Sequence, residues 1–143
     1  MVKNATYGFE AGKLYAVVGP SGSGKSTLLS MLAGLDAPGE GDVVLGEDNL
    51  KALDLDKYRR EGVSIIFQAF CLLPLLTVRE NVCLPMEMQG IPENEARIRA
   101  AEALVKVGIE ESKHKRFPSA LSGGEQQRVA IARSLCRDRK SVV

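Results

Sequence analysis

The feature that most constrains this chain is a pair of glycine-rich turns, each placed where a helix is expected to begin. The first runs from Gly19 to Ser26 and reads GPSGSGKS, and the second runs from Leu121 to Arg128 and reads LSGGEQQR. Backbone N–H groups at a helix N-terminus, left accessible by glycine, form a favourable place for phosphate. Two such turns of different design indicate a fold that holds a phosphorylated ligand from two sides.

The first turn fits the phosphate-loop pattern G-x-x-x-x-G-K-[ST]. The apolar run from Leu14 to Val18 precedes it and predicts a buried strand, and a helix is expected from about Lys25, with Gly34 as its stop. The lysine brings positive charge to the outer phosphates, and the Ser26 hydroxyl is a hard oxygen ligand for Mg²⁺. A glycine turn without a ligand is the alternative interpretation. The candidate binding residues are Gly19, Ser21, Gly22, Ser23, Gly24, Lys25, Ser26 and Thr27.

The second turn has the form of a capping box, in which Ser122 and Glu125 satisfy each other's backbone N–H groups. A capping box needs no ligand. It does not explain Gly123 and Gly124, however, because each glycine costs about 1 kcal/mol against alanine inside a helix. Close approach of the backbone to an anion explains both. The helix that follows is expected to bury a stripe made of Val129, Ala132 and Leu135.

The rest of the first half alternates between strand and helix patterns. Strands are predicted at 41–46 and 63–67, and a short helix at 55–61. This alternation is typical of an α/β core with a parallel sheet.

From Thr77 onward the residues favour helices. Thr77 and Glu80 predict one helix start, and a second helix is predicted over 92–107, with its apolar face at Ala101, Leu104 and Val105. His114 lies in the charged run Lys113–Arg116 and is predicted to be solvated.

Charge, cysteines and hydropathy exclude several classes of protein. Nineteen basic and eighteen acidic residues give a net charge of +1 without a basic cluster, so no nucleic-acid partner is expected. Cys71, Cys83 and Cys136 form no C-x-x-C pair, so no disulfide partner or zinc site is expected, and a reducing, cytoplasmic compartment is indicated. The apolar run 69–76 contains Pro74 and is too short to cross a bilayer.

With its extension LSGGEQQRVAIAR, the second turn resembles the signature sequence of ATP-binding-cassette (ABC) proteins, and the resemblance covers the chain from about Tyr7 to Arg137. It implies an α/β fold, a P-loop NTPase core of the ABC type with a helical signature subdomain, incomplete at its C-terminus. It also implies ATP and Mg²⁺ as cofactors. In that family two nucleotide-binding domains pair, so Ser122, Gly123 and Gly124 would act on ATP held by the phosphate loop of a second copy.

Gln68 resembles the glutamine of the family's Q-loop, which would join Ser26 at the magnesium ion and sense a membrane partner. A polar residue that ends a strand is the alternative interpretation. The apolar residues from Phe70 to Leu76 fit either a core or a docking surface for a membrane subunit. The stretch from Phe67 to Pro74 is similar to lipoprotein-releasing and macrolide- or peptide-exporting ATPases.

The resemblance predicts one partial nucleotide-binding domain over 1–143. Residues 1–76 form mainly the α/β core, 77–137 the helical subdomain with the signature helix, and 138–143 a tail. Codons for that tail can match a widely used sequencing-library adapter, so a non-native origin is one interpretation of it. Tyr7 is not assigned as an adenine-stacking residue.

The family's second magnesium carboxylate, catalytic glutamate and switch histidine would follow the signature helix, and no catalytic residue is assigned in this chain. The chain alone is therefore expected to be inactive and weakly folded. The expected function is that of an ATP-binding subunit at the cytoplasmic face of a membrane, which couples ATP hydrolysis to transport, in the export direction, by a separate permease. The alternatives are a soluble ABC ATPase of DNA repair or translation, and a catalytically dead fragment with nucleotide-binding elements alone.

Overall fold

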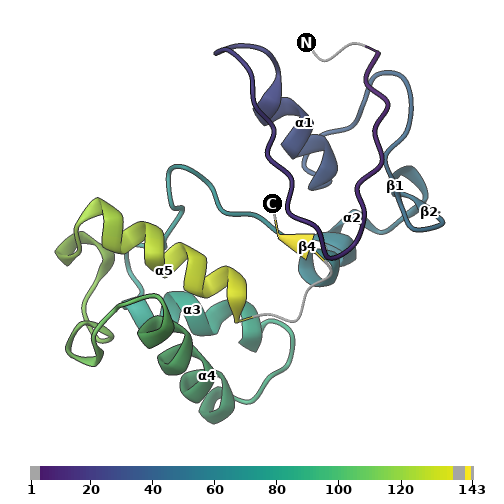
Figure 1. Cartoon of the computed structure of the whole chain (residues 1–143). Helices are drawn as coiled ribbons and strands as arrows, with labels where there is room; N and C mark the ends of the chain where they lie inside the picture. Colours follow the sequence, from purple (N-terminus) through teal and green to yellow (C-terminus); the bar gives the residue numbers. More distant parts are fainter. Residues whose placement is uncertain (1–3, 137–140, 143) are drawn as a thin grey trace. The chain divides into compact units, whose positions relative to one another are not determined.

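The computed structural model describes residues 4–136 and 141–142. The chain divides into two compact units, Met1–Arg59 and Arg60–Val143, and each is described by itself. Figure 1 shows the elements of both units along the chain. The predicted division after residue 76 falls inside the second unit and stays a prediction.

Helix α1 (Lys25–Leu32) follows the first glycine turn and ends where the sequence predicts. Gly34 adopts a left-handed conformation with φ of 66°. Its N–H donates to Met31 O at 3.1 Å, and the N–H of Leu35 donates to Ser30 O at 2.9 Å. These two bonds form a Schellman motif, which satisfies the last carbonyls of the helix. The predicted start and stop of this helix are confirmed.

A second short helix packs against the end of α1. Helix α2 (Leu55–Lys57) is capped by Asp54 and continues as a π-helical turn over Tyr58–Gly62. The Tyr58 hydroxyl donates to Leu32 O at 2.8 Å. A Cβ atom on Gly34 would lie 3.0 Å from the Tyr58 ring, so the ring packs directly on the glycine. The helix predicted over 55–61 is confirmed in position.

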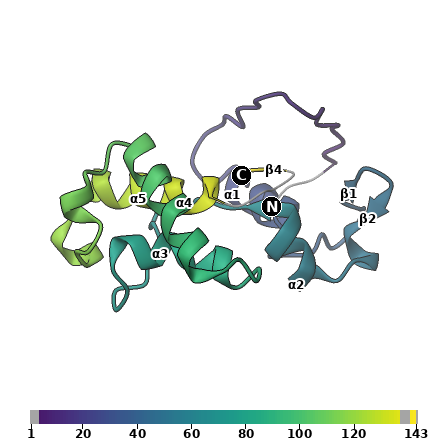
Figure 2. The same ribbon diagram turned by 90° about the horizontal axis from the view of Figure 1, so that it is seen from below.

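A β-hairpin lies between these helices in the chain (Figure 2). Strands β1 (Val44–Leu45) and β2 (Asp48–Asn49) pair in antiparallel register, with Val44 opposite Asn49. A loop of two residues joins them, and its first residue, Gly46, has φ of 64°, as tight hairpin turns require. The strand predicted over 41–46 is therefore present but shorter, and its hairpin partner was not predicted.

The buried strand predicted at Leu14 to Val18 is wrong. The structure has no strand between residues 4 and 20, and Leu14 is 100% exposed. A buried parallel strand needs a neighbour and covered faces, and the hairpin strands of this unit pair only with each other. The segment is held locally instead, by edge-to-face contacts among the rings of Tyr7, Phe9 and Tyr15.

The second unit begins with strand β3 (Val63–Ser64), which pairs in parallel with β4 (Ser141–Val142). The strand predicted over 63–67 is correctly placed, but only its first two residues pair. Of the predicted tail 138–143, residues 138–140 and 143 lie outside the described residues.

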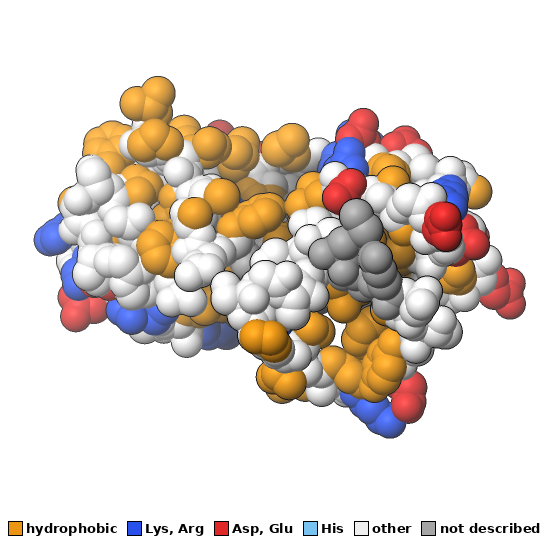
Figure 3. Space-filling model, turned by 90° about the horizontal axis from the view of Figure 1, so that it is seen from above, with side chains coloured by type: hydrophobic (Ala, Val, Ile, Leu, Met, Phe, Trp, Pro, Cys, Tyr) orange, Lys and Arg blue, Asp and Glu red, His pale blue; other side chains and the backbone are white. Residues whose placement is uncertain are grey.

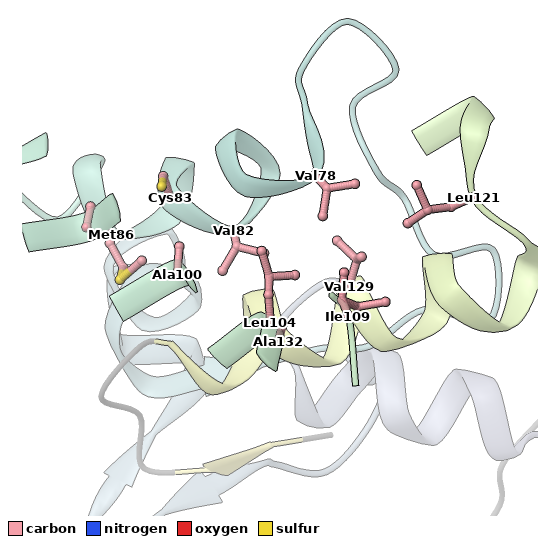
Figure 4. Packing of buried hydrophobic residues seen from close by; sticks show 11 residues of the cluster. Val78, Val82, Cys83, Met86, Ala100, Leu104, Ile109, Leu121, Val129 and Ala132 are labelled. Carbon is pink, nitrogen blue, oxygen red and sulfur yellow. The ribbon is translucent and has the colours of Figure 1, made fainter. Parts of the chain in front are cut away.

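Three helices form the core of the second unit, α3 (Val78–Glu87), α4 (Glu93–Lys106) and α5 (Gly123–Leu135), and they pack side by side (Figure 1). Short 3-10 turns at Glu111–Lys113 and Pro118–Ala120 connect α4 to α5. Figure 4 shows the apolar side chains between the helices. The buried cluster comprises Val78, Val82, Cys83, Met86, Ala96, Ala100, Leu104, Ile109, Leu121, Val129 and Ala132.

The predicted helix faces are partly wrong. In α4 the buried face runs through Ala96, Ala100 and Leu104, while Val105 is 53% exposed. In α5 Leu135 is exposed as well. Helix α4 contacts both α3 and α5, so the two neighbours decide which of its faces is covered.

The prediction that His114 is solvated is also wrong. Its side chain is 3% exposed, and its Nε2 lies 3.1 Å from Ile109 O. The preceding 3-10 turn directs this ring inward while Lys115 and Arg116 stay at the surface. The His114 carbonyl also accepts a hydrogen bond from the N–H of Arg79 at 3.0 Å, which ties the turn to α3.

Candidate functional site

The first glycine turn has a backbone that only glycine adopts without strain. Gly22 and Gly24 have φ of 78° and 94°, and Gly24 directly precedes α1. A Cβ atom on Gly19 would lie 2.9 Å from the Ser23 hydroxyl oxygen, so the Ser23 side chain would have to rotate to admit it. The loop therefore forms a tight cradle of bare backbone ahead of the helix.

Positive charge gathers at this cradle. The Lys25 ammonium group donates to Gly19 O at 2.9 Å and to Pro20 O at 2.8 Å, which holds its side chain folded over the loop. Helix α1 has no side-chain cap and no acidic residue in its first turn. The positive end of the helix dipole and the ammonium group thus lie together, which is the arrangement that binds phosphate. Ser26 and Thr27 lie in the first turn of α1, and Ser21 lies in the exposed part of the loop.

The second glycine turn forms the predicted capping box. The Ser122 hydroxyl accepts from the N–H of Glu125 at 3.3 Å, and the Glu125 carboxylate accepts from the N–H of Ser122 at 2.9 Å. The Lys113 ammonium group lies 2.6 Å from the same carboxylate. The hydrogen bond from Lys113, followed by those from Ser122, lowers the pKa of Glu125 to about 2. A fixed negative charge therefore holds this turn.

Gly123 and Gly124 are exposed, and the fold does not require glycine at either position. A Cβ atom on Gly123 would meet no atom within 4 Å. A Cβ atom on Gly124 would meet the Arg128 guanidinium at 3.8 Å, an ordinary contact. Neither residue has the positive φ that favours glycine. Neither the space around these residues nor their backbone conformation therefore requires glycine at the start of α5.

Gln68 is exposed and lies in a loop that follows β3. Two residues later, Phe70 and Cys71 have φ of 60° and 47°, which is unusual for residues other than glycine. The Arg133 guanidinium on α5 donates to Cys71 O at 2.7 Å and to Phe70 O at 2.9 Å. Arg133 was not predicted as a site residue, because nothing in its local sequence pattern distinguishes it from other helix-surface arginines.

The structure assembles each predicted group of site residues within one unit. Residues 19–27 form the cradle of the first unit, and Ser122 to Gly124 form the turn of the second unit, which also carries Gln68. The pairing of Ser26 with Gln68 as magnesium ligands spans both units and stays a prediction.

The apolar run after Gln68 is divided between core and surface. Leu72 packs against the buried cluster, whereas Leu73 and Leu75 are 45% and 88% exposed. Figure 3 shows many hydrophobic side chains on the viewed face of the molecule. Among the described residues, no helix has the length and apolar character needed to cross a membrane.

A sequence model of the ABC transporter family matches residues 2–143, which is nearly the whole chain. The chain belongs to the ABC transporter family.

Several relatives are similar over most of this chain. An uncharacterized ABC transporter ATP-binding protein of Mycobacterium tuberculosis, Rv0986, is 43% identical over 96% of this chain and 56% of its own length. YclH of Bacillus subtilis, with the same description, is 43% identical over 94% of this chain and 60% of its own length. The chain therefore spans little more than half the length of these curated relatives.

A solved structure confirms the fold at the level of the family. The dimeric post-hydrolysis state of the ATP-binding cassette MJ0796, bound to ADP and Pi, matches with a TM-score of 0.80 and 43% identity, over 86% of this chain and 56% of that chain. MJ0796 comes from Methanocaldococcus jannaschii. The chain thus has the P-loop fold of ABC ATPases over the part that it shares with this cassette.

Proposed function

We propose that this chain is part of the ATP-binding subunit of an ABC transporter, and that it binds magnesium-ATP with residues 19–27. The cradle of bare backbone supports this proposal, since Gly22 and Gly24 have φ of 78° and 94° and the Lys25 ammonium group is held over the loop. Lys25 supplies a positive charge to the outer phosphates, and the Ser26 hydroxyl and Gln68 amide oxygen are hard ligands of the kind that Mg²⁺ prefers. Bound Mg²⁺ neutralises phosphate charge.

The glycine pair Gly123–Gly124 carries the second part of the proposal, that the signature turn contacts ATP on another copy of the chain. Both glycines are exposed and unneeded by the fold, so an external group that approaches the backbone accounts for them. The dimeric state of the MJ0796 cassette, which is bound to ADP and Pi, gives a precedent for such a partner.

Nucleotide binding by the first turn is tested with a fluorescent ATP analogue and Mg²⁺. Lys25→Ala should weaken binding by at least tenfold, because it removes the charge folded over the loop. Lys57→Ala is the matched control, since this lysine is exposed on α2 of the same unit. Equal affinities of the two variants would contradict the proposal.

Action on a second copy is tested by mixing two variants. Lys25→Ala and Ser122→Arg should each abolish association driven by magnesium-ATP, measured by sedimentation. An equal mixture should associate again, because the loop of the Ser122→Arg copy meets the intact turn of the Lys25→Ala copy. If the turn serves the loop of its own copy, the mixture stays unassociated. Ser119→Arg, at an exposed neighbouring position, should leave association unchanged.

We also infer that the chain acts with a membrane partner. A cytoplasmic location beside a separate permease, in the export branch of the family, follows from the resemblance of Phe67 to Pro74 and from the exposed Leu73 and Leu75. An adjacent gene for a multi-spanning permease would support it. A neighbourhood of DNA-repair or translation genes would favour a soluble ABC ATPase, and nucleotide binding without ATP hydrolysis or an adjacent permease gene would favour a catalytically dead fragment.

A further inference from the structure

We propose that Arg133 is a positioning residue that ties the Gln68 loop to helix α5, so that this loop and the Ser122 turn belong to one rigid unit. The significance of this link for nucleotide binding rests on the proposed function. The link itself is a structural claim that is tested without nucleotide.

The contact is bidentate. One guanidinium nitrogen of Arg133 donates to Cys71 O at 2.7 Å, and the other donates to Phe70 O at 2.9 Å. The partners are 62 and 63 residues apart in sequence, so the contact joins two distant segments of the second unit. The planar fork of arginine fits two neighbouring carbonyl oxygens, whereas lysine offers a single point of contact.

The backbone that accepts these bonds needs external support. Phe70 and Cys71 are consecutive residues in the left-handed region, where the Cβ atom of an ordinary residue is crowded. Such conformations persist only where the surroundings hold them. Two local bonds, from Phe70 N to Phe67 O and from Cys71 N to Ala69 O, close the turn, and Arg133 anchors it to the helix.

Because Arg133 lies on α5, its contact with the loop is connected through this helix to the Ser122 turn. Helix α5 begins at Gly123, directly after Ser122, and Arg133 lies in its last turn. A helix rises about 1.5 Å per residue, so the two ends of this link are roughly 15 Å apart along one rigid element. A group that shifts the N-terminus of α5 therefore shifts the Gln68 loop as well.

Cys71 provides a probe at the turn itself. Its side chain is exposed, whereas Cys83 is buried and Cys136 is half-buried. Burial raises the pKa of both of those thiols to about 11, so Cys71 reacts first at neutral pH. A nitroxide label on Cys71 leaves the backbone carbonyl free to accept from Arg133.

The test compares the mobility of this label by electron paramagnetic resonance in the unsubstituted chain and in Arg133→Lys, without nucleotide. We expect the rotational correlation time to shorten roughly twofold in Arg133→Lys, because the loop gains nanosecond motion. Arg97→Lys, in an exposed ion pair on α4, is the matched control and should leave the spectrum unchanged. Ethylguanidinium added to Arg133→Ala should restore the slower motion. An unchanged spectrum in Arg133→Lys, with helix content retained by circular dichroism, overturns the proposal.

If the variants do not fold, hydrogen exchange of the unsubstituted chain tests whether the Gln68 loop is tied to α5. The Phe70 amide should become exposed together with the amides of the last turn of α5 as denaturant is added. Fast exchange at Phe70 while α5 stays protected overturns the proposal. Because neither measurement uses ATP, a failure of nucleotide binding leaves this result standing and contradicts the proposed function alone.

Discussion

At the scale of single residues, the buried polar side chain of Asn81 on α3 ties the loop before this helix to the start of the helix. Its Nδ2 donates to the carbonyls of Leu73, Leu76 and Thr77 at 3.0, 3.1 and 3.0 Å, and its Oδ1 accepts from the N–H of Leu73 at 2.7 Å. The side chain is buried, so it replaces the water that these groups would otherwise bind.

Asn81→Asp should therefore destabilise the second unit strongly. The carboxylate cannot donate to three carbonyls, and burying it beside them adds repulsion, so we expect a loss of about 2–3 kcal/mol in the free energy of unfolding. Urea denaturation measures it. Gln89→Glu is the control, because its amide makes an exposed hydrogen bond to Arg60 O, and its effect should stay below about 1 kcal/mol. Similar effects of both variants would show that Asn81 does not support the segment.

The ionised Glu125 carboxylate should stabilise the start of α5 in a pH-dependent way. Its folded pKa of about 2 lies below its ordinary value of 4.5, so its contribution to stability is complete above pH 4.5 and is lost as pH falls toward 2. In an NMR titration, Lys113→Gln should raise this pKa toward the ordinary value, because Lys113 makes the largest contribution. Hydrogen bonds from Thr77 lower the pKa of the Glu80 carboxylate, and this pKa should not change in the Lys113→Gln variant. A Glu125 titration unaffected by Lys113→Gln would contradict this assignment.

At the scale of elements, the helices differ in how they begin. Helices α3 and α5 begin with capping boxes at Thr77 and Ser122, whereas α1 has Gly24 at its N-cap position and no side-chain cap. Helix α1 therefore depends on its C-terminal end, where Gly34 and Tyr58 meet.

Gly34→Ala should weaken this junction. The backbone there has φ of 66°, and the added Cβ would lie 3.0 Å from the Tyr58 ring, so we expect a loss of about 1–2 kcal/mol. Urea denaturation followed by circular dichroism measures the loss. Gly39→Ala, at a position without positive φ and with nothing within 4 Å, is the matched control and should change little. An effect no larger than that of the control would show that the junction tolerates a side chain.

At the scale of the whole molecule, the second unit contains most of the described buried apolar side chains, and the first unit contains few. The described hydrophobic core of the first unit comprises Ala33, Leu50 and Tyr58, while the other buried hydrophobic residues belong to the second unit. Since apolar burial is the main favourable term in folding, the second unit should be the more stable one.

Limited proteolysis tests this difference. Cleavage should start in the segment 4–20, which has no strand and exposes Leu14, and a fragment that contains α3, α4 and α5 should persist. Magnesium-ATP should slow the early cleavage if the phosphate loop binds it. Cleavage of the three helices before that of the first unit would contradict the prediction.

Features that depend on neighbours a few residues away were predictable from the amino-acid sequence. The two glycine turns, the capping boxes at Thr77 and Ser122 and the stop of α1 at Gly34 are all local, and the structure confirms them. The family also follows from these motifs, because their residue types and spacing are unusual. The backbone geometry of the first glycine turn was therefore predictable from the sequence.

Features that need a partner far away in the sequence were not predictable from local patterns. The apolar residues at Leu14 to Val18 match a buried strand, yet a strand forms only where another strand lies beside it. His114 is buried because a turn directs it inward between helices, although its neighbours in sequence are charged. Arg133 donates hydrogen bonds to a loop more than 60 residues away in the sequence. The packing of α3, α4 and α5 brings together residues that are far apart in the sequence. A pattern of neighbouring residues therefore does not reveal these contacts.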